Sequence, residues 1–243
     1  MSLVSVVIAS YNRFGYLLKA IKSVQEQTYK NIEIIVVNDG SFQKEYVDYK
    51  FADNITVLHR EVNSRREFGY ANLGHVRNQG IKIAKGEYIA ILDDDDYWLS
   101  TKIEKQLEEM KKNKCEFSCT KALIDEKGWG GIGGSYDITK KYSNIYDYNH
   151  IMKSRYDVDI NLKDGDIFFI KNGQCSKKFN SIICSSVLIR KDLLIKVLYM
   201  DTGKPTGEDR RTWMKLLEIT DCLLINTPLI YYDVGHGDGR QWL

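Results

Sequence analysis

The sequence has few of the residues that mark linkers, disulfide frameworks or zinc sites. Its 243 residues include only two prolines and no run rich in serine and glycine, so nothing indicates a hinge between separate domains. The five cysteines are odd in number and form no C-x-x-C pair, which favours reduced thiols in a cytoplasmic protein. We therefore expect a single domain over residues 1–243.

Long apolar runs and a dominant sign of charge are also missing. The first apolar run, residues 4–9, is too short for a signal peptide or a membrane span, and no later run is longer than a strand. A formal net charge of +2, from 35 basic and 33 acidic residues, gives no reason to expect nucleic-acid binding. With 43% hydrophobic residues the chain can still bury a sizeable core, so we expect a soluble protein with no transmembrane segment.

Apolar runs and helical periodicities alternate through the first hundred residues. Short runs rich in β-branched residues predict buried strands, and apolar residues at helical spacing predict the helices between them. The predicted strands are 4–9, 32–37, 54–59 and 87–92, and the predicted helices are 17–27 and 71–84, with Gly86 as the cap of the second. This alternation predicts an α/β fold with a mostly parallel, doubly wound sheet.

The pattern is weaker in the remaining chain. Ser100 is expected to cap a helix with a capping box, and residues 125–180 show no clear period. The G-x-G-x-x-G at 128–133 is followed by no helical pattern, so we interpret it as a loop rather than a dinucleotide site. Further strands are expected at 116–124, 181–189, 222–225 and 229–232, and further helices at 191–198 and 213–219.

Four consecutive aspartates, residues 93–96, follow the apolar strand predicted at 87–92. Ligands of parallel α/β sheets bind beyond the carboxyl ends of the strands. Adjacent carboxylates repel one another unless a cation or hydrogen-bond donors neutralise them, and oxygen ligands suit Mg²⁺ or Mn²⁺ shared with a phosphate. The run therefore predicts a metal–diphosphate site, with a solvated acidic loop as the alternative.

Other polar residues belong to the same predicted edge of the sheet. Tyr11 follows the first strand, Asp39 follows the second, and Arg77 lies on the helix before the acidic run. Because the carboxyl ends of parallel strands lie along one edge, these side chains can converge on one ligand.

Four segments, VSVVIASYNR, SVQEQTYKNIEIIVVNDGS, VRNQGIKIAKGEYIAILDDDDYW and GEDRRTWMKL, resemble in this order the family 2 glycosyltransferases of the GT-A fold. The resemblance implies a Rossmann-like, mostly parallel sheet with helices on both faces, a nucleotide-binding half (1–100) and a less regular acceptor-binding half (101–243). It also implies an inverting, metal-dependent enzyme of glycan biosynthesis. Such an enzyme moves one sugar from a UDP-sugar to a hydroxyl of a glycan or glycoconjugate acceptor, with Mn²⁺ or Mg²⁺ as cofactor.

The resemblance assigns donor binding to residues of the first half. It places Ala9, Tyr11 and Asp39 around the base and ribose, and Arg77 near the base and diphosphate. A carboxylate at position 39 can accept the imide N–H of uracil, which cytosine lacks. The alternatives are that Asp39 supports its own turn and that Arg77 forms a surface salt bridge.

The D-x-D motif of the family falls on the acidic run. The resemblance implies that Asp95 ligates the metal and that Asp94 contacts the ribose or the donor sugar. It also implies that Asp93 and Asp96 orient the turn. Because the run has four acids, the residue that ligates the metal could be one position away. We include Asp93, as well as Asp94, among the expected donor-binding residues. His236 lies where some relatives have a second metal or diphosphate contact, and a structural or solvated histidine is the alternative.

Asp209, which opens a helix after Gly207, has the position of the family's catalytic base. Such a base deprotonates the acceptor hydroxyl as it attacks the anomeric carbon, and direct attack inverts the anomeric configuration. A helix start stabilises the ionised form of a carboxylate. The alternative is an ordinary helix-start acid.

Two other functions fit parts of the pattern. A sugar-phosphate nucleotidyltransferase should have a glycine-rich basic loop after its first strand, where this chain has Ser-Tyr-Asn-Arg. A non-catalytic carbohydrate- or nucleotide-binding protein on the same fold needs no base. The tail at 239–242 differs in order from the Q-x-x-R-W signature of processive synthases, which favours transfer of a single sugar.

Overall fold

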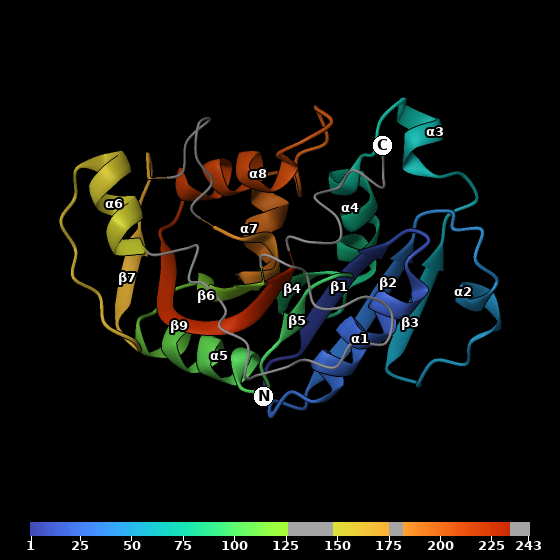
Figure 1. Ribbon diagram of the computed structural model, residues 1–243, viewed down its shortest axis with the longest axis horizontal. Coiled ribbons are helices and arrows are strands. Elements are labelled where there is room, and N and C mark those ends of the chain that lie inside the picture. Colours follow the sequence, from blue (N-terminus) through green and yellow to red (C-terminus); the bar gives the residue numbers. More distant parts are fainter. Residues whose placement is uncertain (126–147, 175–181, 234–243) are drawn as a thin grey trace.

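The computed structural model describes residues 1–125, 148–174 and 182–233, and in this part of the chain nine strands form one sheet (Figure 1). The strand order is β3-β2-β1-β4-β8-β6-β9-β5, and β7 pairs with β9 outside this path. The strands are β1 (Val4–Ser10), β2 (Ile32–Asn38), β3 (Ile55–His59), β4 (Tyr88–Asp93), β5 (Tyr97–Trp98), β6 (Phe117–Asp125), β7 (Ile167–Ile170), β8 (Leu188–Arg190) and β9 (Cys222–Asp233).

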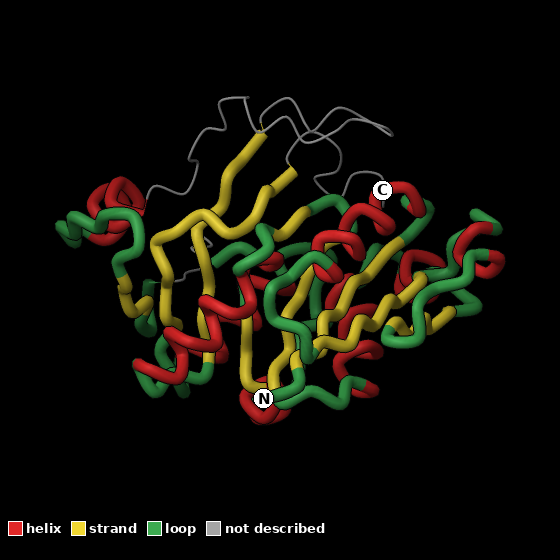
Figure 2. The backbone as a smooth tube through the Cα atoms, turned by 90° about the horizontal axis from the view of Figure 1, so that it is seen from below, coloured by secondary structure: helices red, strands yellow, loops and turns green. Residues whose placement is uncertain are grey.

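The described helices lie on both faces of this sheet (Figure 2). They are α1 (Phe14–Gln25), α2 (Glu45–Asp48), α3 (Ser64–Phe68), α4 (Leu73–Ile83), α5 (Lys102–Lys112), α6 (Tyr148–Tyr156), α7 (Lys191–Lys196) and α8 (Glu208–Leu217), with a 3₁₀ turn η1 (Cys184–Ser186).

The two halves of the sheet differ in strand direction. In the first half β3, β2, β1 and β4 are parallel, as the alternating pattern predicted. The short strand β8 then pairs antiparallel with both β4 and β6, while β6 runs parallel to the long strand β9. The prediction of a mostly parallel sheet with helices on both faces is confirmed, and one continuous sheet joins the two halves.

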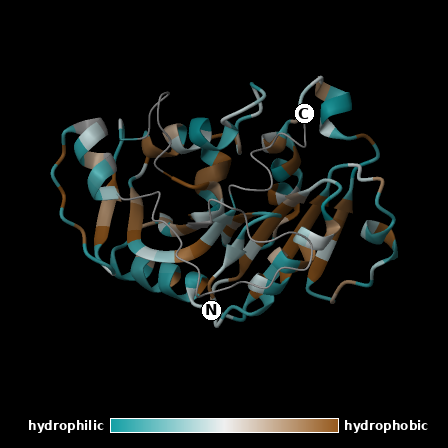
Figure 3. Ribbon diagram, in the orientation of Figure 1, coloured by the Kyte–Doolittle hydropathy of each residue, from teal (hydrophilic) through white to brown (hydrophobic). Residues whose placement is uncertain are grey.

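Alternating residues of β1 pack into two separate cores. Val7 and Ala9 face a core that contains residues of α4, α7 and α8. Val4, Val6 and Ile8 face a second core that contains residues of α1 and α5. This arrangement follows from the period-2 geometry of a strand that is buried on both faces. Figure 3 shows β1 and β2 mainly in the colours of hydrophobic residues and α5 mainly in those of hydrophilic residues.

Register fixes the edge at which the predicted site residues meet. Ala9 of β1 is opposite Val37 of β2 on one side and opposite Asp93 of β4 on the other. The carboxyl ends of these three strands therefore lie next to one another, and the segments that follow them share one edge of the sheet.

One predicted strand forms over only part of its length, and two others are joined into one. The expected strand 181–189 is replaced by η1 and the short β8, and Ser186 Oγ there donates to the carbonyl oxygen of Ile183 at 2.7 Å. Such local side-chain bonds compete with strand pairing. The two expected strands 222–225 and 229–232 form the single strand β9, because the Asn-Thr-Pro sequence is absorbed at an irregularity in its pairing with β6 rather than breaking the strand.

Both predicted helix caps are also wrong. The helix α5 has Thr101 rather than Ser100 at its N-cap, with no side-chain hydrogen bond, and the C-cap of α4 is Ala84 rather than Gly86. Gly86 is required for another reason: a Cβ there would lie 2.6 Å from the backbone nitrogen of Ser5.

Five short elements were not predicted: α2, α3, α6, β5 and β7. The glycine-rich segment 128–133 lies outside the described residues. No helix in the described ranges combines the length and the apolar character needed to cross a membrane.

Candidate active site

The four aspartates form a tight turn at the end of β4. The backbone N–H of Asp96 donates to the carbonyl oxygen of Asp93 at 3.1 Å, which closes the turn. Asp93 is partly exposed, whereas Asp94, Asp95 and Asp96 are only 4%, 7% and 0% exposed. The alternative of a solvated acidic loop is therefore wrong.

Arg13 is a cation in direct contact with the two central aspartates of this acidic turn. It lies just before α1, and its Nη1 donates to Asp94 Oδ1 at 3.1 Å and to Asp95 Oδ2 at 2.8 Å. The side chain is buried, so the ion pairs are shielded from solvent. Sequence analysis gave Arg13 no role, although its position after the first strand is the same signal that identified Tyr11.

A directed chain of hydrogen bonds reaches Asp94 from α2. Ser10 Oγ donates its single proton to Asp94 Oδ2 at 2.7 Å, so the hydroxyl of Tyr46 must be the donor in its 2.5 Å bond with Ser10 Oγ. The Tyr46 oxygen in turn accepts from the backbone N–H of Arg13 at 3.1 Å. Burial raises the pKa of Asp94, while Arg13 and Ser10 lower it, and these donors favour the ionised carboxylate.

We expect Tyr46→Phe to destabilise the fold by about 1–3 kcal/mol, because the backbone N–H of Arg13 loses its acceptor and Ser10 loses its donor in a buried site. Tyr49→Phe is the matched control, since Tyr49 is exposed and both rings pack edge-on against Phe14. Urea unfolding of the two variants measures the difference. Equal stability of the two variants would contradict the role of the Tyr46 hydroxyl.

Asp96 joins the acidic turn to the end of β9. It accepts hydrogen bonds from the hydroxyl of Ser185 and, at 2.9 Å, from the backbone N–H of Asp233. Ser185 Oγ also accepts the backbone N–H of Asp93 at 3.0 Å. Asp96 thus has the position of a turn-orienting residue, and it holds the last described strand against the site.

The charge of the turn fits a divalent cation bound together with a ligand. Burial, followed by the charge of Asp94, raises the pKa of Asp95 to about 8, although Arg13 lowers it. Among the described residues no group of three or more His, Cys, Asp or Glu is arranged to hold a metal alone. One or two carboxylates completed by phosphate oxygens is the usual way in which proteins hold Mg²⁺. His236 lies outside the described residues.

Asp39 lies at the same edge, after β2, and is fully buried. Its Oδ1 accepts from the backbone N–H of Ser64 at 2.9 Å and from Arg60, and its Oδ2 accepts from Ser64 Oγ at 2.7 Å. Burial raises the pKa of Asp39, and these donors lower it. A carboxylate offers about four acceptor positions, so these three bonds leave room for one more. Sequence analysis missed both Ser64 and Arg60.

Arg77 connects the N-terminal end of α8 to the acidic turn. Arg77 Nη2 donates to Asp93 Oδ1 at 2.5 Å, and its Nη1 donates to Glu208 Oε1 at 2.6 Å. Because Arg77 is only 3% exposed, the alternative of a surface salt bridge is wrong. The predicted base Asp209 is the next residue after Glu208.

The surroundings of Asp209 weaken its acidity. Burial, with the charge of Glu208, raises the pKa of Asp209 to about 6. The backbone N–H of Arg210, which donates to Asp209 Oδ1 at 2.6 Å, and the charge of Arg77 act in the opposite direction. A carboxylate with this pKa is mainly ionised at neutral pH and can accept a proton.

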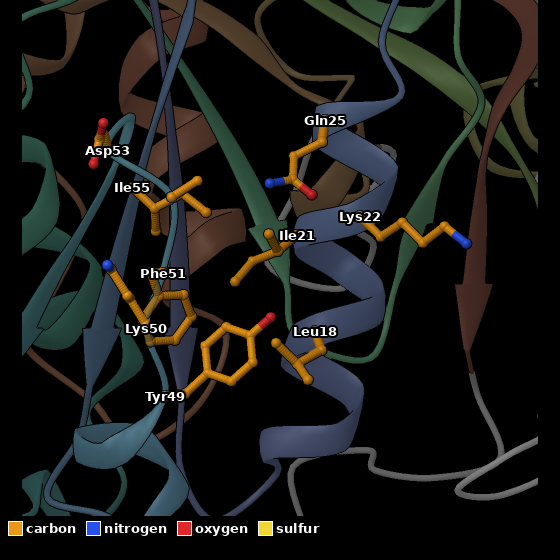
Figure 4. Close-up of a pocket in the computed structure, with 10 residues that line it drawn as sticks. Leu18, Ile21, Lys22, Gln25, Tyr49, Lys50, Phe51, Asp53 and Ile55 are labelled. Carbon is orange, nitrogen blue, oxygen red and sulfur yellow. The ribbon is translucent and has the colours of Figure 1, made fainter.

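The structure thus brings Ala9, Asp39 and the acidic turn together at one sheet edge, and Arg77 joins that edge to Asp209. Tyr11 follows β1 at this edge and is half-buried. A separate hollow of about 610 Å³ lies between α1 and the segment before β3 and contains none of the predicted site residues (Figure 4). Leu18 and Ile21 line it on one side and Tyr49 and Phe51 on the other.

Comparison with known proteins gives a consistent result. The family model for glycosyl transferase family 2 matches residues 5–198. The UDP-Glc:alpha-D-GlcNAc-diphosphoundecaprenol beta-1,3-glucosyltransferase WfaP of Escherichia coli is 38% identical over 127 residues, which are 52% of this chain and 48% of that protein. The glycosyltransferase GlyG of Streptococcus pneumoniae is 29% identical over 238 residues, which are 95% of this chain and 70% of that protein.

Solved structures with a similar fold include S. aureus TarS 1–349. The TM-score is 0.63 at 16% identity, over 95% of this chain and 60% of that one. The same protein in complex with UDP-GlcNAc gives a TM-score of 0.62 at 17% identity. These likenesses confirm the predicted fold. The chain spans about half the length of the E. coli relative.

Proposed function

Because this chain belongs to glycosyl transferase family 2, we propose that it transfers one sugar from a UDP-sugar to a hydroxyl of a glycan or glycoconjugate acceptor, with inversion and with Mn²⁺ or Mg²⁺. The observation that carries the proposal is the buried acidic turn, Asp93–Asp96, which Arg77 joins to the helix that bears Asp209. A nucleotide-binding first half, an acceptor-binding second half and a cytoplasmic location stay predictions.

Donor binding uses the sheet edge. In this proposal Ala9, Tyr11 and Asp39 surround the base and ribose, and Asp94 contacts the ribose or the donor sugar. The names of two similar proteins support a UDP-sugar, since one uses UDP-Glc and the other has been solved with UDP-GlcNAc. Asp95 would hold the metal, which would supply positive charge beside the leaving diphosphate.

Acceptor activation uses Asp209. Its carboxylate takes the proton of the acceptor hydroxyl while the hydroxyl oxygen forms the new bond to the anomeric carbon, and the bond from that carbon to UDP breaks. A pKa of about 6 keeps Asp209 ionised at neutral pH and still allows it to bind the proton that it removes. One direct displacement inverts the anomeric centre.

Release of UDP from a panel of nucleotide-sugars tests the proposal. With Mn²⁺ present, we expect UDP release from at least one UDP-sugar, faster when glycan acceptors are added, and no release in EDTA. GDP- and CMP-sugars should be inert. Glycan binding that needs neither nucleotide nor metal, with no turnover of any donor, would instead support the binding protein. Formation of pyrophosphate from UTP and a sugar phosphate would support the nucleotidyltransferase.

A further inference from the structure

We propose that Ser64 sets the preference for uracil over cytosine, by holding Asp39 as an ionised carboxylate whose remaining acceptor position is available to the base. The proposal rests on the proposed function, because it concerns the base of a UDP donor. It adds to the site a residue that sequence analysis missed. Ser64 is a positioning residue in this proposal, since it acts through Asp39 rather than by contact with the nucleotide.

Ser64 is fully buried and binds both oxygens of the Asp39 carboxylate. Its backbone N–H donates to Asp39 Oδ1 at 2.9 Å, and its hydroxyl donates to Asp39 Oδ2 at 2.7 Å. Its Oγ also accepts the backbone N–H of Asn72, the N-cap residue of α4, at 3.2 Å. Ser64 therefore joins three segments: the end of β2, the start of α3 and the start of α4.

The direction of these hydrogen bonds favours the ionised form of Asp39. The backbone N–H of Asn72 is a donor, so the single proton of the Ser64 hydroxyl is the one given to Asp39 Oδ2. Asp39 Oδ1 accepts from two N–H donors, one of Ser64 and one of Arg60. These three bonds all point toward the carboxylate. A proton on Asp39 could occupy only the acceptor position that they leave.

The backbone around Ser64 is held next to Asp39 by contacts that do not involve the Ser64 hydroxyl. A Cβ on Gly40, the residue after Asp39, would lie 2.8 Å from the backbone nitrogen of Asn63. The side chain of Asn63 accepts the backbone N–H of Arg65 at 2.9 Å and so caps α3. Removal of the Ser64 hydroxyl should therefore change the hydrogen bonding of Asp39 without moving the segment.

The proton state of Asp39 decides which pyrimidine it can recognise. N3 of uracil carries a hydrogen and N3 of cytosine does not, so an ionised carboxylate accepts from uracil only, whereas a protonated carboxyl group could donate to cytosine N3. Burial raises the pKa of Asp39, and the hydrogen bond from the Ser64 hydroxyl is the largest of the causes that lower it. Loss of this hydroxyl should therefore raise the pKa and weaken the discrimination.

The other charged and titratable groups near Asp39 are the same with and without the Ser64 hydroxyl. They are Arg60, which follows β3, His75 on α4, and Glu67 on α3, which pairs with Arg60. Burial, followed by the charge of Arg60, lowers the pKa of His75. A difference between the unchanged protein and a variant at Ser64 therefore reports on Asp39 and not on a change in these groups.

The test measures the dissociation constants of UDP and CDP by calorimetry with Mn²⁺, for the unchanged protein and for Ser64→Ala. The metal and the diphosphate are common to both nucleotides and cancel in the ratio of the two constants. We expect the CDP-to-UDP ratio to fall about tenfold in Ser64→Ala, through weaker UDP binding, as for the loss of a hydrogen bond to a charged group. KM for the UDP-sugar should rise by a similar factor while kcat stays unchanged.

The pH dependence of this ratio is a second readout. Between pH 5 and pH 8 the ratio should fall toward acid pH as Asp39 becomes protonated, and the fall should begin at a higher pH in Ser64→Ala. In an Asp39→Asn background Ser64→Ala should not lower the ratio further, because Ser64 acts through Asp39.

Two further variants control for folding. Ser23→Ala is the matched control, since Ser23 is also fully buried and its hydroxyl donates at 2.7 Å to the carbonyl oxygen of Ala20 in α1, away from the site. It should keep the ratio of the unchanged protein. Ser64→Cys preserves the size of the side chain and replaces the hydroxyl with a weak donor, so its ratio should fall even if Ser64→Ala folds poorly.

The possible failures are distinguishable. An unchanged ratio in Ser64→Ala and Ser64→Cys, or an equal loss of UDP and CDP affinity, would overturn the role of Ser64 in the choice of base and leave the proposed function intact. The absence of UDP binding and of turnover in the unchanged protein would overturn the proposed function, and this proposal with it.

Discussion

Asp209→Asn is expected to lower the rate of sugar transfer by about 10²–10⁴-fold and to leave UDP and metal affinity unchanged. An amide keeps the shape of the side chain and its contact with the Arg210 N–H, but it cannot accept the proton of the acceptor hydroxyl. The measurement is UDP release at saturating UDP-sugar and acceptor. Asp192→Asn is the matched control, because Asp192 is also an acid in the first turn of a helix and its carboxylate pairs with Arg190 rather than with a residue of the site.

The pH dependence of the same rate provides a second test of Asp209. Below its pKa of about 6 the carboxylate becomes protonated and cannot act as a base, so the rate should fall about tenfold for each further pH unit. The residual rate of Asp209→Asn should lack this limb. Full activity in the variant, or an identical acid limb, would contradict the assignment of the base.

Loss of folding does not explain the expected effect. The folded-state pKa of Asp209 is raised from 3.8 to about 6, so its stabilising contribution is present below pH 3.8 and is lost as pH rises through about 6. At pH 7 the ionised carboxylate therefore disfavours the folded state, and Asp209→Asn should be at least as stable as the unchanged protein. Thermal unfolding at pH 7 checks this expectation.

Asp95→Asn is expected to weaken metal-dependent UDP binding by at least about a hundredfold, since even residues that only orient metal ligands cost 10- to 100-fold. The amide side chain would keep an oxygen but could not become the carboxylate anion that pairs with the cation. The measurement is a calorimetric titration of Mn²⁺ into the protein with UDP present. Asp53→Asn, an exposed acid in the hollow beside α1, is the control.

Alternative outcomes of that titration are informative. Loss of binding in Asp94→Asn together with normal binding in Asp95→Asn would move the metal ligand by one position along the turn. Normal metal-dependent binding in both variants would contradict a metal site on the acidic turn.

The edge of the sheet was predictable because the alternation of strands and helices indicates parallel strands, whereas the order of the strands was not predicted. Once β1, β2 and β4 are recognised as parallel strands, Ala9, Asp39 and Asp93 must lie near one another. The register of the strands confirms that these three residues lie at one edge of the sheet, as the parallel direction of the strands predicted.

The partners of these residues were not predictable in the same way. Tyr46 reaches Ser10 from α2, and Ser64 reaches Asp39 from α3, and both helices are too short to show a period. The bond from Arg77 to Glu208 joins residues 131 positions apart and depends on how α8 packs. Sequence analysis identified the acids at the site, whereas most of the groups that neutralise them depend on tertiary contacts.

Calorimetric titration of UDP into the unchanged protein tests most directly whether the sheet edge binds UDP together with a metal. We expect binding with Mn²⁺ that is lost in EDTA. UDP should bind more tightly than CDP, because a carboxylate at Asp39 accepts the imide N–H that cytosine lacks. Binding that is indifferent to both metal and base, or no binding of any nucleotide, would contradict the account.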